Sequence, residues 1–228
     1  MCADFSVNRA DGGILVAAVK APNERITLVH RLTERLWADG QEFLFSAQNF
    51  ADKTPAEDGL SKLEGYCLDD IPVWQYRAGK ITVERTCAMA YGENTTAIMY
   101  SLRNDTAAPC TFTVTPYLKF APKETALKQK KEFTLTDYRI TADGYMLYMH
   151  TEGKITPFTD WQELHYPADE ADGRPDRGFA GSCCNISITV PAQSEDVLKI
   201  VFSTEEKVDS ADAIMQAEQK KVQRIKPH

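Results

Sequence analysis

The feature of this sequence that most constrains its fold is a two-residue alternation of apolar and polar side chains. In residues 111–115, Phe and Val alternate with three threonines, and the same period occurs in residues 96–102, 184–190 and 198–202. Successive side chains of a β-strand point to opposite faces of a sheet, so this alternation places one set on a buried face and the other toward water. The pattern predicts antiparallel strands with one buried face.

Short turn sequences separate the apolar segments. Residues 38–40 and 142–144 both read Ala-Asp-Gly, and residues 78–80 read Ala-Gly-Lys. Asp and Gly tolerate the positive φ angles of tight hairpins, so each of these three positions predicts a hairpin. Repeated strands and turns of this kind favour an all-β fold: a large antiparallel β-sandwich of roughly a dozen strands, of the supersandwich, galactose mutarotase-like type.

Length and charge narrow the class of protein further. A chain of 228 residues can bury a sizeable core as one large domain. Its formal charge of -7 argues against nonspecific nucleic-acid binding, which requires a basic surface. No apolar run approaches the ~20 residues of a membrane-spanning helix, and residues 14–21 lack the basic leader of a signal peptide. We therefore expect no nucleic-acid partner, no membrane and a cytoplasmic location.

Six cysteines occur, and none forms a Cys-x-x-Cys pair. Their density is below that of a disulfide-stapled scaffold, so we expect them to be reduced, with Cys87 and Cys110 acting as small apolar side chains on strands. No zinc-protease, phosphate-loop or serine-hydrolase motif is present. The sequence therefore predicts no metal and no cofactor.

Two segments depart from the strand pattern. Residues 157–181 are rich in Pro, Gly, Asp and aromatic residues, which predicts a long ordered loop. Residues 208–225 carry apolar residues near helical spacing, with Asp209 or Ser210 as the cap and lysines and an arginine toward the end. We expect a β-sandwich domain over residues 1–206 and a C-terminal helix or linker over residues 207–228.

Catalytic groups are not evident from the residues alone. Acidic pairs such as Asp69-Asp70 are common in a chain with 33 acids, and most are expected to be solvated. Histidines are few. A mutarotase-like enzyme would need a His acid beside a carboxylate, for which His150 and His165 are the candidates, whereas His30 lies in an apolar strand and favours a place in the core or at a sheet edge.

Aromatic residues give the candidate binding surface. Sugar rings stack their C–H faces on aromatic planes while nearby polar groups bond the hydroxyls. Two groups of residues fit this chemistry. The first is the pair Trp74 and Tyr76, whose i, i+2 spacing places them on one face of a strand and whose alternative place is the core. The second is the set of aromatic and acidic residues in the expected loop. The candidate substrate-binding residues are thus Trp74, Tyr76, Asp160, Trp161, Glu163 and Tyr166.

From about Gly13 to Phe202 the chain resembles the N-terminal domain of bacterial and archaeal glycogen debranching enzymes. The segments that carry the resemblance are GILVAAVKAP, LTERLWADGQEFLFSAQNF, LEGYCLDDIPVWQYRAGKITVERTCAMAYGENTTAIMYSL, TPYLKF and WQELHYPADEADGRPDRG. Their order and spacing follow the family. In place of the Arg-x-Tyr-His that commonly precedes the first apolar strand, residues 9–12 read Arg-Ala-Asp-Gly. We therefore assign no catalytic residue.

The resemblance implies a non-catalytic β-sandwich that packs against an (α/α)6 barrel, absent from this chain, and supports binding of an α-glucan or maltodextrin. In the family that barrel cleaves α-1,6 branch linkages. Three alternatives stay open at this point: a free-standing carbohydrate-binding module acting through Trp161, a mutarotase-like sugar isomerase, and a pure docking domain with an exposed apolar patch.

Overall fold

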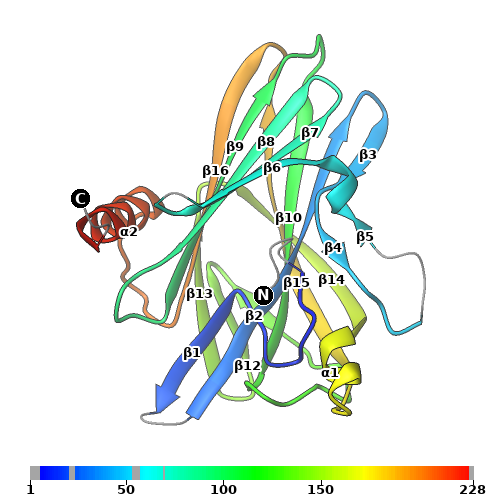
Figure 1. Cartoon of the computed structure of the whole chain (residues 1–228), viewed down its shortest axis with the longest axis vertical. Helices are drawn as coiled ribbons and strands as arrows, with labels where there is room; N and C mark the ends of the chain where they lie inside the picture. The colour runs from blue at the N-terminus through cyan, green and yellow to red at the C-terminus, as the bar shows by residue number, and fades with distance from the viewer. Residues whose placement is uncertain (1–5, 21–23, 53–56, 69, 226–228) are drawn as a thin grey trace.

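The computed structural model describes residues 6–20, 24–52, 57–68 and 70–225. Two large antiparallel sheets face each other (Figure 1). The first has the order β1-β2-β10-β15-β14, with β3 paired to β2. Its strands are β1 (Leu15–Lys20), β2 (Glu24–Ala38), β3 (Gln41–Leu44), β10 (Cys110–Pro122), β14 (Lys154–His165) and β15 (Arg177–Val190).

The second sheet has eight strands in the order β11-β12-β13-β16-β9-β8-β7-β6. A separate two-stranded sheet joins β4 (Ala47–Gln48) to β5 (Glu57–Asp58), followed by a 3-10 turn at Gly59–Lys62. The strands of the eight-stranded sheet are β6 (Leu63–Leu68), β7 (Pro72–Ala78), β8 (Ile81–Met89), β9 (Thr95–Asn104), β11 (Thr134–Thr136), β12 (Arg139–Ala142), β13 (Tyr145–Thr151) and β16 (Ser194–Ser203). Two helices complete the fold: α1 (Pro167–Ala171) and α2 (Ala211–Ile225).

The predicted all-β sandwich is therefore confirmed, with sixteen strands in the described residues where the sequence indicated about twelve. The three predicted hairpin turns are also present. Asp39 and Gly40, Gly79, and Asp143 and Gly144 all have positive φ angles. Glycine and aspartate at these positions relieve the backbone strain of the turn, so the local sequence fixes the registers of β2–β3, β7–β8 and β12–β13.

The core lies between the two sheets. The apolar members of the alternating segments, such as Phe112, Val114 and Ile186, meet Leu198 and Ile200 from the facing sheet, and all are buried. Burial of each such side chain stabilises the fold by about 1.5–3 kcal/mol before entropy is counted. The sandwich is held mainly by this apolar layer.

One ion pair crosses that core. Glu34 on β2 accepts two hydrogen bonds from Nη1 of Arg85 on β8, at 2.8 and 2.7 Å, and one from the Tyr100 hydroxyl at 2.6 Å. Nη2 of Arg85 donates to the Tyr76 hydroxyl at 2.7 Å, and the guanidinium lies 4.6 Å from the ring centroid of Trp74. Both charged side chains are about 1% exposed. The pair ties the two sheets together at one register.

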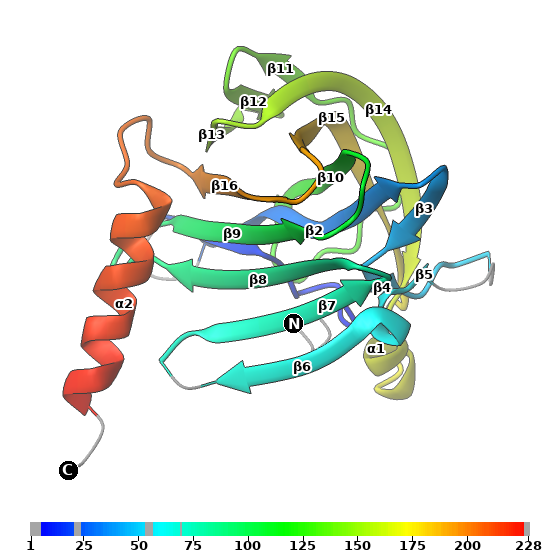
Figure 2. The same cartoon turned by 90° about the horizontal axis from the view of Figure 1, so that it is seen from above.

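Helix α2 lies across the outer face of β16, β9 and β8 (Figure 2). Ser210 caps its start: its carbonyl accepts from the Ile214 N–H at 3.0 Å and its hydroxyl from the Ala213 N–H at 3.3 Å. The helix buries Ile214 and Met215 against Val201, which points away from the sandwich core. The predicted C-terminal helix is confirmed, and it packs on the domain.

The predicted loop over residues 157–181 is wrong. Strand β14 continues to His165 and pairs with β15, and only Tyr166, the short helix α1 and residues 172–176 lie between them. A register shift between Pro157 and Asp160 breaks the alternation, and β14 is the last strand of its sheet. Proline is tolerated at sheet edges and bulges. Because Pro157 and the register shift interrupt the alternation, the sequence pattern did not reveal this strand.

Candidate functional site

Trp161 lies on β14 and its ring covers Gly181 of the neighbouring strand. A Cβ added at Gly181 would lie 2.3 Å from a ring carbon of Trp161, so only glycine leaves room for the indole. The ring also stacks on Phe133, with centroids 5.7 Å apart and planes 27° apart, and Phe133 packs edge-on to Phe120. Trp161 is half-buried, and its ring contacts Phe133 and Gly181.

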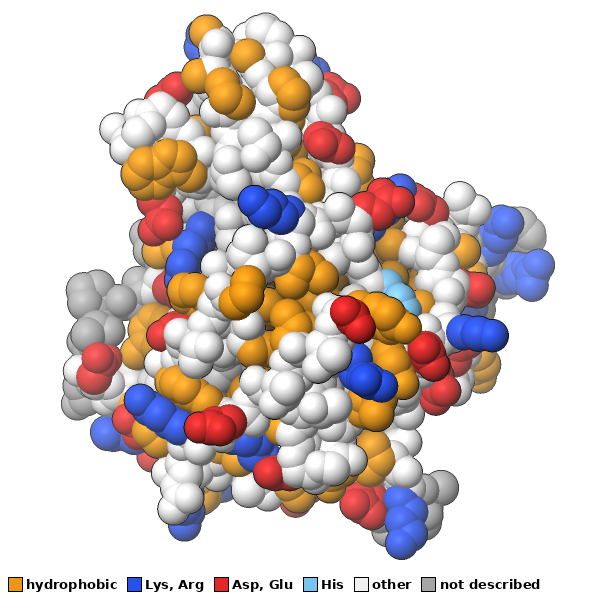
Figure 3. All heavy atoms as spheres, turned by 180° about the vertical axis from the view of Figure 1, so that it is seen from behind, with side chains coloured by type: hydrophobic (Ala, Val, Ile, Leu, Met, Phe, Trp, Pro, Cys, Tyr) orange, Lys and Arg blue, Asp and Glu red, His pale blue; other side chains and the backbone are white. Residues whose placement is uncertain are grey.

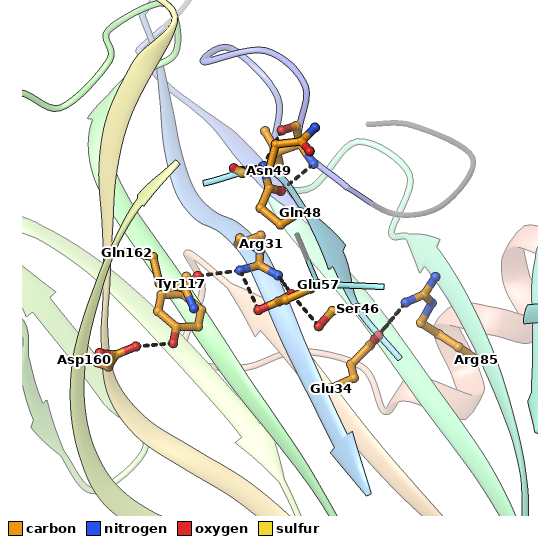
Figure 4. A network of polar contacts seen from close by, with 11 residues as sticks. Arg31, Glu34, Ser46, Gln48, Asn49, Glu57, Arg85, Tyr117, Asp160 and Gln162 are labelled. Carbon is orange, nitrogen blue, oxygen red and sulfur yellow. Dashed lines mark hydrogen bonds and ion pairs between the residues drawn. The ribbon is translucent and has the colours of Figure 1, made fainter. Parts of the chain in front are cut away.

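Asp160 takes part in a polar network on the outer side of the six-stranded sheet (Figure 4). Its Oδ2 accepts a hydrogen bond from the Tyr117 hydroxyl at 2.5 Å. Burial and the hydrogen bond to Asp160 raise the pKa of Tyr117 well above its ordinary value, so the hydroxyl remains a donor at neutral pH. Glu163, two strand positions beyond Trp161, is exposed.

Arg31 occupies the centre of the same network. Its guanidinium donates to Glu57 and to the side-chain oxygen of Gln162, and lies 5.5 Å from the ring centroid of Tyr117. The Ser46 hydroxyl donates to Glu57 at 2.7 Å. The side chains of Arg31 and Glu57 are 1% and 9% exposed. Because these charges are paired and buried, the network attaches β4 and β5 to the sheet.

Tyr166 and His30 form a second buried pair. His30 Nδ1 lies 2.9 Å from the Gly12 carbonyl oxygen, an acceptor only, so Nδ1 carries the proton and Nε2 accepts from the Tyr166 hydroxyl at 3.0 Å. Burial, and then the charge of Lys119, lower the pKa of His30 to about 3. The ring is therefore neutral at physiological pH. Tyr166 has no exposed surface and cannot contact a ligand from this position.

Trp74 and Tyr76 also lie inside the sandwich, where they are 5% and 3% exposed. They pack with the guanidinium of Arg85 as described above. Their i, i+2 spacing on β7 does place both on one face, but that face is the core. Of the six candidate binding residues, the structure thus brings Asp160, Trp161 and Glu163 onto one strand and buries the other three.

His165 lies near two carboxylates at the end of β14. Its Nε2 is 2.9 Å from Oε2 of Glu170 and 3.7 Å from Oδ2 of Asp176. The three ligand atoms lie within 4.8 Å of one another, which is close enough for a common divalent cation. Arg177 lies 3.8 Å from the same Asp176 oxygen. The arrangement is a surface cluster in which a hydrogen bond joins His165 to Glu170 and an ion pair joins Arg177 to Asp176.

A cleft of about 490 Å³ opens on the other sheet, between β13, β16 and the start of α2. His150 lines it together with Tyr138, a residue of the β11–β12 turn that no pattern in the sequence singles out. Tyr148 and His150 are two positions apart on β13, and this spacing is the signal that places both on one face. Tyr138 joins them only through the fold, because the β11–β12 hairpin turns it back over β13.

No helix within the described residues has the length and apolar character needed to cross a lipid bilayer. Comparison with curated proteins gave no match. Among solved structures, a candidate kojibiose phosphorylase from the human microbiome shares 9% identity, with a TM-score of 0.42, over 93% of this chain and 29% of its own. A bacterial glucoamylase complexed with acarbose shares 10% identity, with a TM-score of 0.38, over 94% of this chain and 33% of its own.

The chain thus spans about a third of the length of these two solved proteins. Residues 4–196 match the family described as glycogen debranching enzyme N terminal. The matched range begins before β1 and ends within β16, so it includes every strand of both large sheets except most of β16. This chain belongs to the glycogen debranching enzyme N-terminal family.

Proposed function

We propose that this chain is a non-catalytic accessory domain that packs against a catalytic (α/α)6 barrel and supports binding of an α-glucan or maltodextrin. The observation that carries the proposal is the family match over residues 4–196. The family is the N-terminal part of glycogen debranching enzymes, so its members accompany catalytic machinery. The barrel itself is a partner domain or a separate subunit.

An apolar patch beside α2 suits the docking part of the proposal. It consists of Leu68, Met89 and Tyr91, whose side chains are 63%, 50% and 83% exposed. With Glu218 and Lys221 of α2 they line a cleft of about 500 Å³, and Nζ of Lys221 lies 4.5 Å from the ring centroid of Tyr91. Contiguous exposed apolar surface rimmed by charges is typical of interaction sites. We assign this patch to the barrel.

The mutarotase-like alternative would rely on a histidine acting on a sugar hydroxyl. His150 lines a cleft that carboxylates also line, but its Nε2 is buried and has no hydrogen-bond partner among the described residues. Acid–base catalysis requires a histidine nitrogen that reaches the substrate and exchanges its proton. In this position Nε2 reaches neither a carboxylate nor solvent. His165 is bonded to Glu170 on the surface. The geometry favours the accessory role.

Sedimentation velocity with a debranching-enzyme barrel expressed without its own N-terminal domain tests the docking. We expect an equimolar complex that Leu68→Lys and Met89→Lys weaken, since a charge at the centre of an apolar contact loses its hydration. Trp37→Lys is the matched control, because Trp37 is 55% exposed but lies on β2 of the other sheet. Equal effects of all three substitutions, or turnover of branched α-glucan by the isolated chain, would contradict the proposal.

A further inference from the structure

Three rings form an aromatic strip at the β13 end of the eight-stranded sheet: Tyr138, Tyr148 and His150. Their centroids are 5.5 Å apart for Tyr138 and His150, 6.0 Å for the two tyrosines, and 6.4 Å for Tyr148 and His150. The ring planes lie within 34° of one another. Tyr138 is an exposed residue, and the other two are half-buried. The strip is therefore an ordered aromatic surface that solvent can reach.

The strip borders the cleft between β13, β16 and the start of α2. The lining of this cleft contains both apolar and polar groups. Met149, Ile155 and Val201 contribute apolar surface to its lining, and the segment that leads into α2 contributes Asp209 to Asp212. Figure 3 shows the face of the molecule on which β11–β13 lie, where hydrophobic side chains gather around the middle with a histidine and acidic groups beside them. A concave apolar site with a few polar groups is the usual form of a ligand pocket.

The polar groups of the cleft are chiefly acceptors. Glu152, Asp209 and Asp212 line it, and Lys199 donates to Asp212 at 2.7 Å. The buried Nε2 of His150 has no partner among the described residues, whereas buried polar atoms in proteins usually have one. The cleft thus offers carboxylate oxygens next to an aromatic surface, and the buried Nε2 of His150 lies beneath that surface.

We propose that the aromatic strip and this cleft form the α-glucan-binding site of the domain, on a different sheet from β14 and Trp161. This assignment rests on the accessory function proposed above. The C–H face of a glucose ring stacks on Tyr138 and Tyr148, and its hydroxyls donate to the carboxylates at the cleft. A short α-linked oligosaccharide supplies apolar ring faces and several donors together, which matches both parts of the site.

Two contacts order the site before a ligand binds. The Tyr138 hydroxyl donates to Glu206 at 2.9 Å, which holds the ring over β13, and the Lys199–Asp212 pair fixes the first turn of α2 against β16. A pre-ordered site loses less conformational entropy on binding. Because α2 forms one side of the cleft and also borders the apolar patch, a bound glucan would lie against the same helix as the docked barrel.

Calorimetric titration of the intact chain with maltoheptaose tests the assignment. Tyr138→Ala should weaken binding by about tenfold, the change in affinity that 1.4 kcal/mol produces. Tyr138→Phe keeps the ring and loses only the bond to Glu206, so it should retain more affinity than Tyr138→Ala, which separates ring stacking from misfolding. Tyr66→Ala is the matched control, since Tyr66 is an exposed tyrosine at the opposite end of the same sheet. In amide spectra we expect maltoheptaose to shift signals from residues 145–151.

The outcomes separate the site from the function. Binding that Tyr138→Ala weakens while Tyr66→Ala leaves it intact supports the site. Binding that survives Tyr138→Ala and is lost in Trp161→Ala overturns the site, and the accessory function stands. Absence of any binding by the intact chain overturns the site together with the glucan part of the proposed function.

Discussion

The buried ion pair between the two sheets gives the sharpest prediction about stability. In Glu34→Gln the guanidinium of Arg85 stays inside the core, where its side chain is about 1% exposed, without a compensating charge. Breaking one member of a buried pair costs about 3–5 kcal/mol because the remaining charge stays desolvated. For a chain of this length each kcal/mol lowers Tm by about 2–4 °C, so we expect a fall of about 6–20 °C.

Urea unfolding followed by circular dichroism measures this loss. Glu64→Gln is the matched control, because Glu64 bonds Arg77 at 2.6 Å but both side chains are about half exposed, and such pairs contribute less than about 1 kcal/mol. The double change Glu34→Leu with Arg85→Met should recover most of the stability, since an apolar pair of similar volume replaces both charges. If Glu34→Gln cost no more than Glu64→Gln, the role assigned to the pair would be refuted.

Three further predictions concern other buried groups. The pKa of His30 is about 3 in the fold against 6.5 in the unfolded chain, so the unfolded chain binds the extra proton and stability should fall as pH drops from 6.5 toward 3. Thermal unfolding across that range should show a smaller change of Tm with pH for His30→Gln than for the parent chain. Gly181→Ala should cost about 1–3 kcal/mol, because the new Cβ displaces the Trp161 ring, and a shift in tryptophan emission would report it. A thiol reagent should modify exposed Cys67 quickly and spare Cys87, whose pKa burial raises to about 12; a Cys67→Ser chain that kept its rapid phase in full would contradict this.

Strands and hairpins could be predicted because their signals are local. Alternation such as that of residues 111–115 reflects which face of a strand meets the core, and Asp-Gly turns reflect backbone strain at two residues. Val201 shows the limit of the pattern. It occupies an outward position on β16, yet it is buried because α2 covers it, and only the fold brings that helix across the sheet.

The candidate site was less predictable, because exposure of an aromatic side chain depends on contacts between distant segments. Trp74 and Tyr76 have the spacing of a binding surface, but their face of β7 points at Arg85 in the core. Tyr166 is covered through His30, 136 positions earlier in the chain. Tyr138 gains its place beside His150 only when β11 and β12 fold back on β13.

The measurement that tests the central claim most directly is a calorimetric comparison of an α-linked and a β-linked oligosaccharide. Maltoheptaose and cellohexaose contain the same sugar, so nonspecific contact with glucose affects both equally. An accessory domain for α-glucan should give saturable heat with maltoheptaose and a much weaker response to cellohexaose. A flat response to both up to millimolar sugar, or equal affinity for the two, would contradict the claim that this domain supports α-glucan binding.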